Sequence, residues 1–458
     1  MTLYAILVFL AAAVLGYVLN AQAARQIRTA DGPLHSIPKF HGMYAFLLVA
    51  IPSVLLLGFW LLFQNSVVNA LALAAVPDDI ARDLDDTGRA LLISEIRSIA
   101  FGRVFGEPEP WKLDLAERMR TLDAMSDRAL IGVMAMLSAG LLLFARSRVS
   151  AAFRARQRVE RMISGLMIFC SLVAIFTTFG IVASLVTESI RFFDKVPLTE
   201  FLFGLNWEPQ IPLREDQVAA EGAFGWIPVF VGTLVITAVA LTLAVPVGLF
   251  AAIYLNEFAS PRLRAVAKPL LEILAGVPTV VYGFFAVLVV APAIRAFGAY
   301  LGIPVSPNTA LAAGSVMGVM LIPFISSFAD DALSAVPRGL RDGSLALGAT
   351  QGETVMKVLF PAAIPGIVGG ILLAVSRAIG ETMIVVMAAG LIAKLTFNPL
   401  DSVTTVTVQI VTLLIGDTSF DNPKTLAAFA LGLMLFLVTL GINIIALRVV
   451  RKYRELYD

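Results

Sequence analysis

Residues 226–255 read WIPVFVGTLVITAVALTLAVPVGLFAAIYL and contain no charged side chain. A helix needs about 20 mainly apolar residues to cross the hydrocarbon core of a bilayer, and this run exceeds that length. Inside lipid a spanning segment must satisfy its own backbone hydrogen bonds, so the run is expected to be a helix. We predict a transmembrane helix here, and the same criterion, applied to the rest of the chain, decides the fold class.

Eight further runs meet the criterion, in a chain of 458 residues that is 59% hydrophobic and only 15% charged. The nine predicted spans are 2–20, 42–64, 129–146, 163–187, 226–255, 270–294, 309–329, 361–393 and 425–450. The expected fold class is therefore all-α: a polytopic helical membrane protein surrounded by lipid.

Charge and residue counts exclude several classes of function. The net charge of +1 gives no basic face for a nucleic acid, and the chain has one cysteine, Cys170, and two histidines, His35 and His41. None of these lies in a metal-ligand spacing. We expect no metal site, no cofactor and no catalytic residue.

The orientation follows from the basic flanks, because cytoplasmic loops of membrane proteins carry an excess of Lys and Arg. Segment 146–161 holds six arginines against the single acid Glu160, and the loop 257–269 and the tail after 447 are also basic. These three lie on the same side by span parity. We predict a periplasmic N-terminus, a cytoplasmic C-terminus and an external loop at 65–128.

The basic segment also divides the chain. Residues 1–145 form a predicted accessory membrane block of three spans, and 146–161 a cytoplasmic linker. Residues 162–458 then form a complete core of six spans that begins and ends in the cytoplasm. The order of charge around 2–20, with basic residues only after it, favours a retained anchor over a secretory signal.

Segment 331–361 reads DALSAVPRGLRDGSLALGATQGETVMKVLFP and lies on the predicted cytoplasmic side. Its apolar and charged positions predict two short amphipathic helices joined at Gly348 and followed by a membrane span. A helix lying in the lipid headgroups is an alternative interpretation of the same pattern.

The spacing in this segment resembles the EAA loop of bacterial ABC importer permeases. Asp342, Gly343 and Ser344 occupy the triplet, Gly348 the following glycine and Pro361 the closing proline, although the triplet residues themselves differ. The resemblance implies that the loop docks on a separate ATPase and transmits its motion to the pore. The chain carries no GxxxxGK[ST] loop of its own for ATP phosphates.

Two charges lie within the predicted eighth span, where 372–386 reads LLAVSRAIGETMIVV. Arg377 and Glu381 are four residues apart, which on a continuous helix places them on one face. Because charge is costly inside the membrane, such residues face a protein interior or a water-filled path. We predict that Arg377, Glu381 and Thr382 line or gate an anion path; a purely structural ion pair is the alternative.

Three strings resemble the permeases of phosphate importers of the PstC type. They are RAIGETM at 377–383, LAGVPTVVYG at 274–283, and Gly232-Thr233-Leu234 after Phe224-Gly225. The second string contains a predicted helix-break motif formed by Gly276, Pro278, Tyr282 and Gly283, since prolines and glycines interrupt spans at substrate sites. Together with the coupling loop they cover about 220–458; no such string covers 1–145.

The resemblance implies half of a phosphate translocation pore in the bacterial inner membrane. Its implied partners are a PstA-like second permease subunit, a PstB-like ATPase dimer and a PstS-like periplasmic phosphate-binding protein. A permease for another oxyanion, such as molybdate or sulfate, is an alternative within the class. A membrane phosphate-sensing scaffold and a channel are alternatives outside it.

Overall fold

The computed structural model describes residues 2–30, 34–76, 86–102, 109–209, 223–415 and 422–454. Over these ranges nine helices are long and apolar enough to cross a membrane, as the sequence predicts, and the all-α class is confirmed. They are Thr2–Arg28, Pro38–Leu73, Pro110–Ser147, Ala155–Phe193, Ile227–Phe258, Thr279–Tyr300, Ala310–Ala335, Gln351–Ile379 and Pro423–Lys452. The chain forms two compact units, 1–176 and 177–458, which are described separately.

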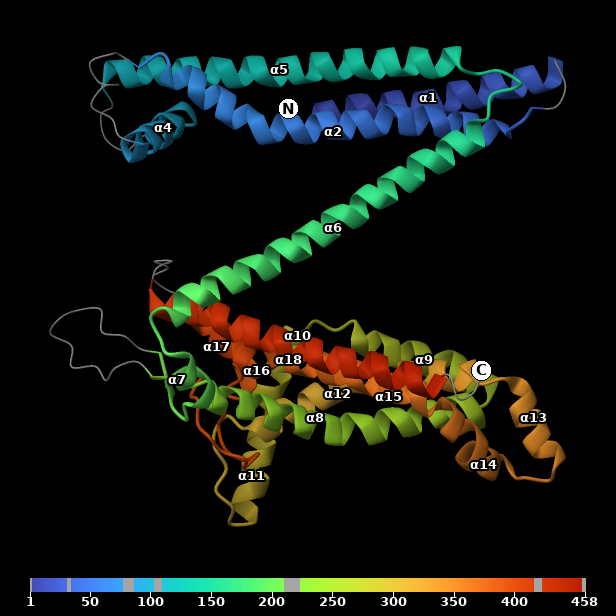
Figure 1. Cartoon of the computed structure of the whole chain (residues 1–458), viewed down its shortest axis with the longest axis vertical. Coiled ribbons are helices and arrows are strands. Elements are labelled where there is room, and N and C mark those ends of the chain that lie inside the picture. Colours follow the sequence, from blue (N-terminus) through green and yellow to red (C-terminus); the bar gives the residue numbers. More distant parts are fainter. Residues whose placement is uncertain are drawn as a thin grey trace. The chain divides into compact units, whose positions relative to one another are not determined.

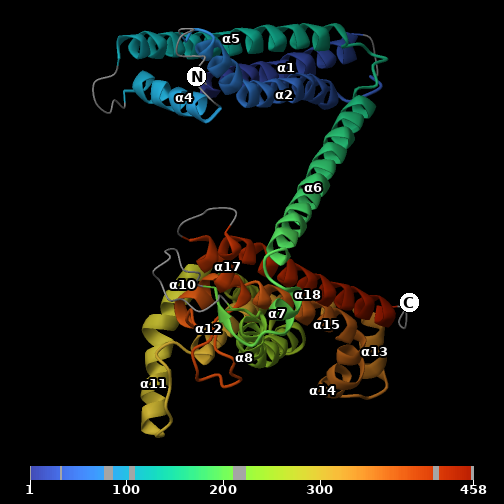
Figure 2. The same cartoon turned by 60° about the vertical axis from the view of Figure 1, so that its left-hand side comes forward.

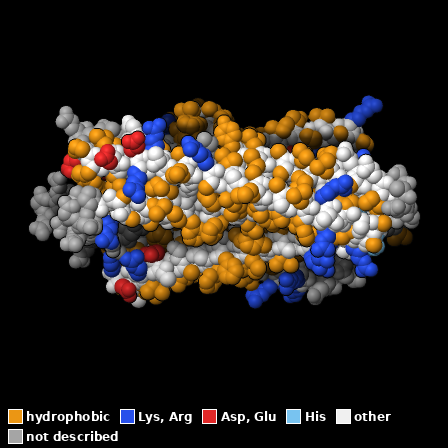
Figure 3. All heavy atoms as spheres, turned by 90° about the horizontal axis from the view of Figure 1, so that it is seen from above, with side chains coloured by type: hydrophobic (Ala, Val, Ile, Leu, Met, Phe, Trp, Pro, Cys, Tyr) orange, Lys and Arg blue, Asp and Glu red, His pale blue; other side chains and the backbone are white. Residues whose placement is uncertain are grey.

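The N-terminal unit is built on three helices that lie side by side: α1 (Thr2–Ala30), α2 (Pro38–Leu73) and α5 (Pro110–Ser147) (Figure 1). The α1 and α2 backbones approach closely at Gly42, where a Cβ would lie 2.7 Å from the Tyr17 carbonyl oxygen. A small residue that lets two backbones approach closely is typical of helix packing in lipid. In Figure 3 hydrophobic side chains fill the middle of the visible face, and Lys and Arg gather toward its ends.

A fourth helix, α4 (Asp86–Ala100), packs against α5 through a small apolar cluster that includes Leu92, Ile96 and Met119. The sequence predicts helices at 79–100 and 110–124 within the loop 65–128. The structure has α4 at the first position, where 79–85 lie outside the described residues, and the second belongs to α5. Helix α6 (Ala155–Phe193) then leads to the C-terminal unit.

The C-terminal unit is a bundle around α12 (Ala310–Ala335), which is the most buried of the candidate spans. Helix α12 packs along α8 (Ile227–Ile253) and α15 (Phe360–Ile379), and α15 contacts α18 (Pro423–Arg454) (Figures 1 and 2). Gly314 and Gly318 permit the contact with α8, since a Cβ at either would lie within 3 Å of α8 atoms. The α12 sequence is therefore small and apolar on its packing face.

One end of this unit carries a compact aromatic cluster. Helix α7 (Leu198–Phe203) is followed by the short antiparallel strands β1 (Trp207–Glu208) and β2 (Ala223–Phe224), with Trp207 opposite Phe224. Phe192 packs edge-on against Phe201 and Phe224, and Trp207 packs edge-on against Phe224. Helix α17 (Val406–Leu414) completes the cluster through Val406 and Leu413.

The other end carries the segment after α12. It comprises α13 (Arg338–Ala346), α14 (Gln351–Thr354) and a π-helical turn, η3 (Val355–Leu359). Figures 1 and 2 show α13 and α14 projecting beyond the bundle, at the end where the C-terminus lies.

Two predicted spans differ from the structure. The sixth, expected at 270–294, is broken at 276–278 between α9 (Pro261–Ala275) and α10 (Thr279–Phe285), and continues through the π-helical turn η2 (Ala286–Val290) into α11 (Ala291–Tyr300). The eighth, expected to run to 393, stops at Ile379, and α16 (Met383–Ala388) follows as a separate helix. Hydropathy alone predicts continuous helices in both places because the flanking residues keep the average apolar, although the second break contains Glu381 and Thr382.

Candidate coupling and substrate-path site

The segment 331–361 folds as two short helices joined at Gly348. Gly348 has a φ of +89°, in the left-handed region that favours glycine. Its N–H donates to the Leu345 carbonyl (3.0 Å) and the Ala349 N–H to the Ser344 carbonyl (3.2 Å). These two bonds are those of a Schellman motif, which satisfies the last carbonyls of α13 and turns the chain sharply.

The second helix begins with a capping box. Thr350 Oγ1 accepts a hydrogen bond from the Glu353 N–H (3.3 Å), and Glu353 Oε2 accepts one from the Thr350 N–H (3.0 Å). Ser344, the last residue of the predicted triplet, lies 3.0 Å from Thr354 through the two hydroxyl oxygens. Pro361 stands in the first turn of α15, directly after the π-helical turn η3. The two helices are therefore fixed relative to each other.

This two-helix segment presents apolar side chains to solvent. Leu340 and Leu345 on α13 are each 44% exposed, Leu347 in the turn is 91% exposed, and Met356 in η3 is 68% exposed. Asp342 and Gly343 of the triplet lie on the same short helix and are also exposed. A projecting surface of this composition is suited to a protein partner.

The break at 276–278 is held by a side chain from the next helix. The Tyr282 hydroxyl donates to the Leu274 carbonyl (2.8 Å), which also accepts from the Val277 N–H (3.3 Å) in the turn after α9. Gly276 follows the last residue of α9, and Pro278 precedes the first residue of α10. Gly283 lies inside α10, where a Cβ would be 2.7 Å from Met387 Sδ of α16. Gly283 therefore permits helix contact and is not itself a break.

The break at 380–382 corrects the expectation that Arg377 and Glu381 share one helix face. Helix α15 ends at Ile379, and Glu381 turns its carboxylate toward α16, accepting from the N–H groups of Met383 (3.0 Å) and Ile384 (3.4 Å). These amides are free donors at a helix start, so a carboxylate satisfies them. Thr382 sits between the helices, its hydroxyl 3.4 Å from the Gly380 carbonyl.

Arg377 lies in the last turn of α15 and is exposed in the single chain. Its guanidinium carbon is 5.4 Å from the centroid of the Phe324 ring. Within the described ranges no carboxylate forms an ion pair with it. Its five N–H donors are thus available to an anion.

Sequence reasoning missed Gln409, a buried residue of α17 that holds three segments together. Its Nε2 donates to the Leu391 carbonyl (2.8 Å) and to Thr404 Oγ1 (3.1 Å), and its Oε1 accepts from Trp207 Nε1 (2.9 Å). A neighbouring bond, from Thr407 Oγ1 to the Glu381 carbonyl (2.9 Å), fixes α17 to the break at 380–382. A lone glutamine in an apolar run was the only signal in the sequence.

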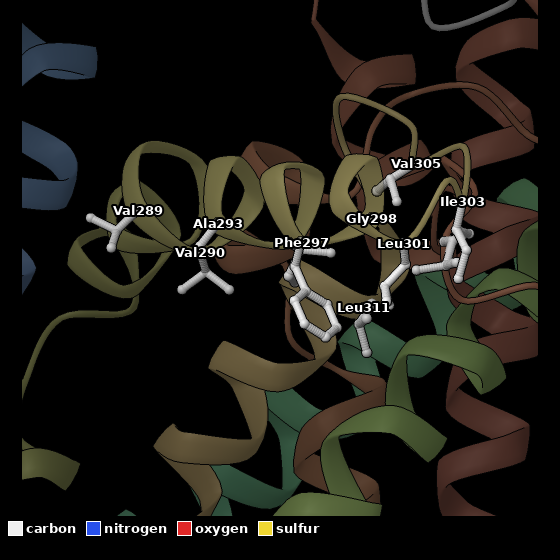
Figure 4. A pocket seen from close by; sticks show the side chains of 11 residues that line it. Val289, Val290, Ala293, Phe297, Gly298, Leu301, Ile303, Val305 and Leu311 are labelled. Carbon is white, nitrogen blue, oxygen red and sulfur yellow. The ribbon is translucent and has the colours of Figure 1, made fainter.

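A hollow of about 480 Å³ lies beside α11, lined by residues such as Val290, Phe297 and Leu311 (Figure 4). All its lining side chains are apolar, so it offers no hydrogen-bond donor to an anion. No group of histidine, cysteine or carboxylate side chains that could hold a metal is present in the described part of the chain.

Comparisons with known proteins identify the family. Residues 244–455 match a family model described as the binding-protein-dependent transport system inner membrane component. The chain is 33% identical over 272 residues to a probable ABC transporter permease, YqgH of Bacillus subtilis, and this covers 59% of the chain and 84% of YqgH. It is 34% identical over 277 residues to the phosphate transport system permease protein PstC 1 of Mycobacterium tuberculosis, covering 55% of the chain and 81% of that protein. The chain belongs to the PstC-type permeases of ABC transporters.

The N-terminal part of this permease has its own match. Residues 6–177 match a model described as a phosphate ATP-binding cassette transporter, whereas the strings that resemble phosphate permeases begin only near residue 220. Among solved structures, a chain of the inward-facing methionine transporter MetNI aligns at 22% identity with a TM-score of 0.36, covering 50% of this chain and 94% of that one. That score is too low to compare the two in detail.

Proposed function

We propose that the permease forms half of the translocation pore of an ATP-driven importer for inorganic phosphate. Two relatives support the proposal, and both are named as phosphate transport system permease proteins. The chain is 34% identical to PstC 1 of Mycobacterium tuberculosis and 31% identical to PstC of Mesorhizobium japonicum. A PstA-like subunit supplies the other half of the pore, and a PstS-like protein delivers phosphate from the periplasm.

A PstB-like ATPase dimer docks on the projecting segment 331–361. Support comes from its exposed apolar residues, since fully burying one leucine side chain contributes about 1.5–3 kcal/mol. Leu347 is nearly fully exposed in the single chain and stands next to Gly348, at the tip of the turn. The orientation that the docking requires is the predicted one, with this segment and the C-terminus in the cytoplasm.

Phosphate passes the region where α15, α16 and α10 meet, and Arg377 is its ligand. The guanidinium is the planar donor best matched to phosphate oxygens. Glu381 and Thr382 shape the same region, but the Glu381 carboxylate is occupied by the amides of α16. The segment 276–283 borders it through the contact of Gly283 with Met387.

Reconstitution tests the proposal. The permease, co-expressed with a PstA-like subunit and a PstB-like ATPase, is placed in liposomes, and uptake of radiolabelled phosphate is measured with a PstS-like protein present. We expect uptake only with ATP, no hydrolysis by the permease alone, and competition by phosphate but not by sulfate or molybdate. Equal competition by sulfate or molybdate would assign the pore to another oxyanion, and ATP-independent flux would indicate a channel.

A further inference from the structure

The loop between α8 and α9 is joined to the coupling segment by one residue, Glu257. It lies in the π-helical turn η1 (Tyr254–Phe258), and its side chain is only 2% exposed. The carboxylate forms an ion pair with Arg341 of α13, and its backbone carbonyl accepts a hydrogen bond from Gln351 Nε2 of α14. Both α13 and α14 therefore bind Glu257.

The same loop and the first turns of α9 are fastened to the end of α12 by a buried carboxylate. Asp330 is 5% exposed and accepts from Arg264 through both oxygens (2.9 and 3.1 Å), from Lys268 (2.6 Å) and from Asn256 (2.6 Å). Asn256 also donates to Ser334 Oγ (2.8 Å). The hydrogen bond to Asp330 raises the pKa of the Lys268 amine, which keeps it charged. Charge-assisted bonds of this kind are short and direction-specific.

Helix α9 links this cluster to the break at 276–278. It runs without interruption from Pro261 to Ala275, and its last turn is tied to α10 by the bond from Tyr282 to Leu274. Gly283 of α10 then contacts α16, the helix that begins beside Glu381. A displacement of the coupling segment thus has a continuous packed route to the region of the proposed phosphate path.

We propose that Glu257 and Asp330 form an ionic clasp that makes the α8–α9 loop part of the coupling device. Motion of α13 and α14 then drives α9 and the break at 276–278, in addition to the covalently attached helices α12 and α15. Glu257, Arg341 and Asp330 are positioning residues: they do not meet the transported ion. The clasp rests on the proposed function, because it assigns a route to the ATP-driven motion proposed above.

Coupling energies between specific pairs provide the test. Glu257→Gln, Arg341→Gln and their combination are introduced into the full complex, together with the charge swap Glu257→Arg with Arg341→Glu. Lys112→Gln, which breaks the Lys112–Glu95 pair (2.9 Å) in the N-terminal unit, is the matched control. Phosphate uptake and ATP hydrolysis are measured in the same liposomes, and retention of the ATPase on purification reports assembly.

We expect each single variant to retain the ATPase and to lower the phosphate transported per ATP by about fivefold or more, the lower limit of typical coupling between sites. The double variant should be no worse than either single variant, the swap should recover most of the ratio, and the control should match the parent. Unchanged ratios in both single variants would overturn the clasp. Loss of the ATPase from Arg341→Gln would also overturn it, since the pair would then act only in docking.

A second readout separates the clasp from the choice of substrate. Backbone hydrogen exchange across 254–275 is compared between nucleotide-free and vanadate-trapped complexes. Protection should change in the parent and in Lys112→Gln but not in Glu257→Gln. If the parent shows this change yet carries no phosphate, the clasp stands and the proposed substrate fails; if exchange in 254–275 responds equally in parent and Glu257→Gln, the clasp is wrong.

Discussion

Substitution of Gly348 tests whether the turn in the coupling segment must keep its shape. A Cβ at this position meets nothing within 4 Å, so a larger side chain has room. The φ of +89° is the only obstacle, because residues other than glycine rarely adopt it. We therefore expect the loss of coupling in Gly348 variants to follow how poorly each residue adopts a positive φ, and not the volume of its side chain.

The magnitude follows from that strain. Holding a non-glycine residue in such a conformation costs about 1–3 kcal/mol, and valine lies at the upper end because it is β-branched. Relaxing the turn instead gives up the Schellman bonds from Gly348 to Leu345 and from Ala349 to Ser344, each contributing about 0.5–1.5 kcal/mol. Either way, the share of molecules in the docking conformation falls about 5- to 150-fold.

The assay is phosphate transported per ATP in liposomes, with expression and membrane insertion checked by immunoblot. We expect Gly348→Asn to lie near the parent, since asparagine tolerates positive φ, Gly348→Ala to be clearly impaired, and Gly348→Val to be nearly uncoupled. Gly339→Ala is the control, because Gly339 lies inside α13 with open space and no positive φ. The reasoning is refuted if valine and asparagine behave alike.

Three further predictions concern the proposed phosphate path, the membrane topology of the chain and the packing around Gln409 in the C-terminal unit. Arg377→Gln should assemble normally but lose phosphate uptake, and Arg377→Lys, which keeps the charge without the planar fork, should recover only part of it in the same liposome assay. A cysteine at exposed Ser94, in a background with Cys170→Ala, should react with a membrane-impermeant thiol reagent in intact spheroplasts; reaction only after lysis would invert the topology. Gln409→Ala should lower the apparent melting temperature in detergent, since each stranded buried partner costs about 1–3 kcal/mol, whereas exposed Gln157→Ala should leave it unchanged.

The sequence was sufficient for the number of spans in the described residues and for the shape of the coupling segment. Length and hydropathy alone mark the helices, because lipid leaves a spanning backbone no alternative partner. Gly348 was identifiable as a turn because a glycine interrupts two amphipathic stretches, and the structure has a positive φ there. Both features depend on local rules.

The two breaks were not predictable in detail from hydropathy. At 380–382 the helix stops because the Glu381 carboxylate offers the N–H groups of Met383 and Ile384 an alternative partner. In the sequence, an arginine and a glutamate four residues apart are equally consistent with an ion pair along one helix. The spacing therefore does not show that the glutamate caps the next helix instead. Gly283, counted with the break motif, is explained by a helix more than 100 positions later in the chain, through Met387.

The clasp is a harder case, since its partners are far apart in the sequence. Asp330 and Arg264 are separated by 66 residues, and Glu257 and Gln351 by 94. The sequence shows an acid at the end of one apolar run and bases after another, which is equally typical of any membrane flank. Only the packing of α8 and α12 decides that these charges meet.

The two breaks also bear on whether Arg377 and Glu381 act as a gate or as a strut, which remains a prediction. Irregular backbone at membrane depth persists only where its polar groups are satisfied within protein or water. Next to 276–278 the Tyr282 hydroxyl adds a bond to the Leu274 carbonyl, and at 380–382 the Glu381 carboxylate and the Thr407 hydroxyl satisfy backbone groups. Glu381 is thereby committed to holding the backbone, while Arg377 keeps only a ring contact with Phe324. The strut and the proposed anion ligand are then different residues, so Glu381→Ala, which removes the accepting oxygen, should weaken assembly under conditions in which Arg377→Gln weakens only transport.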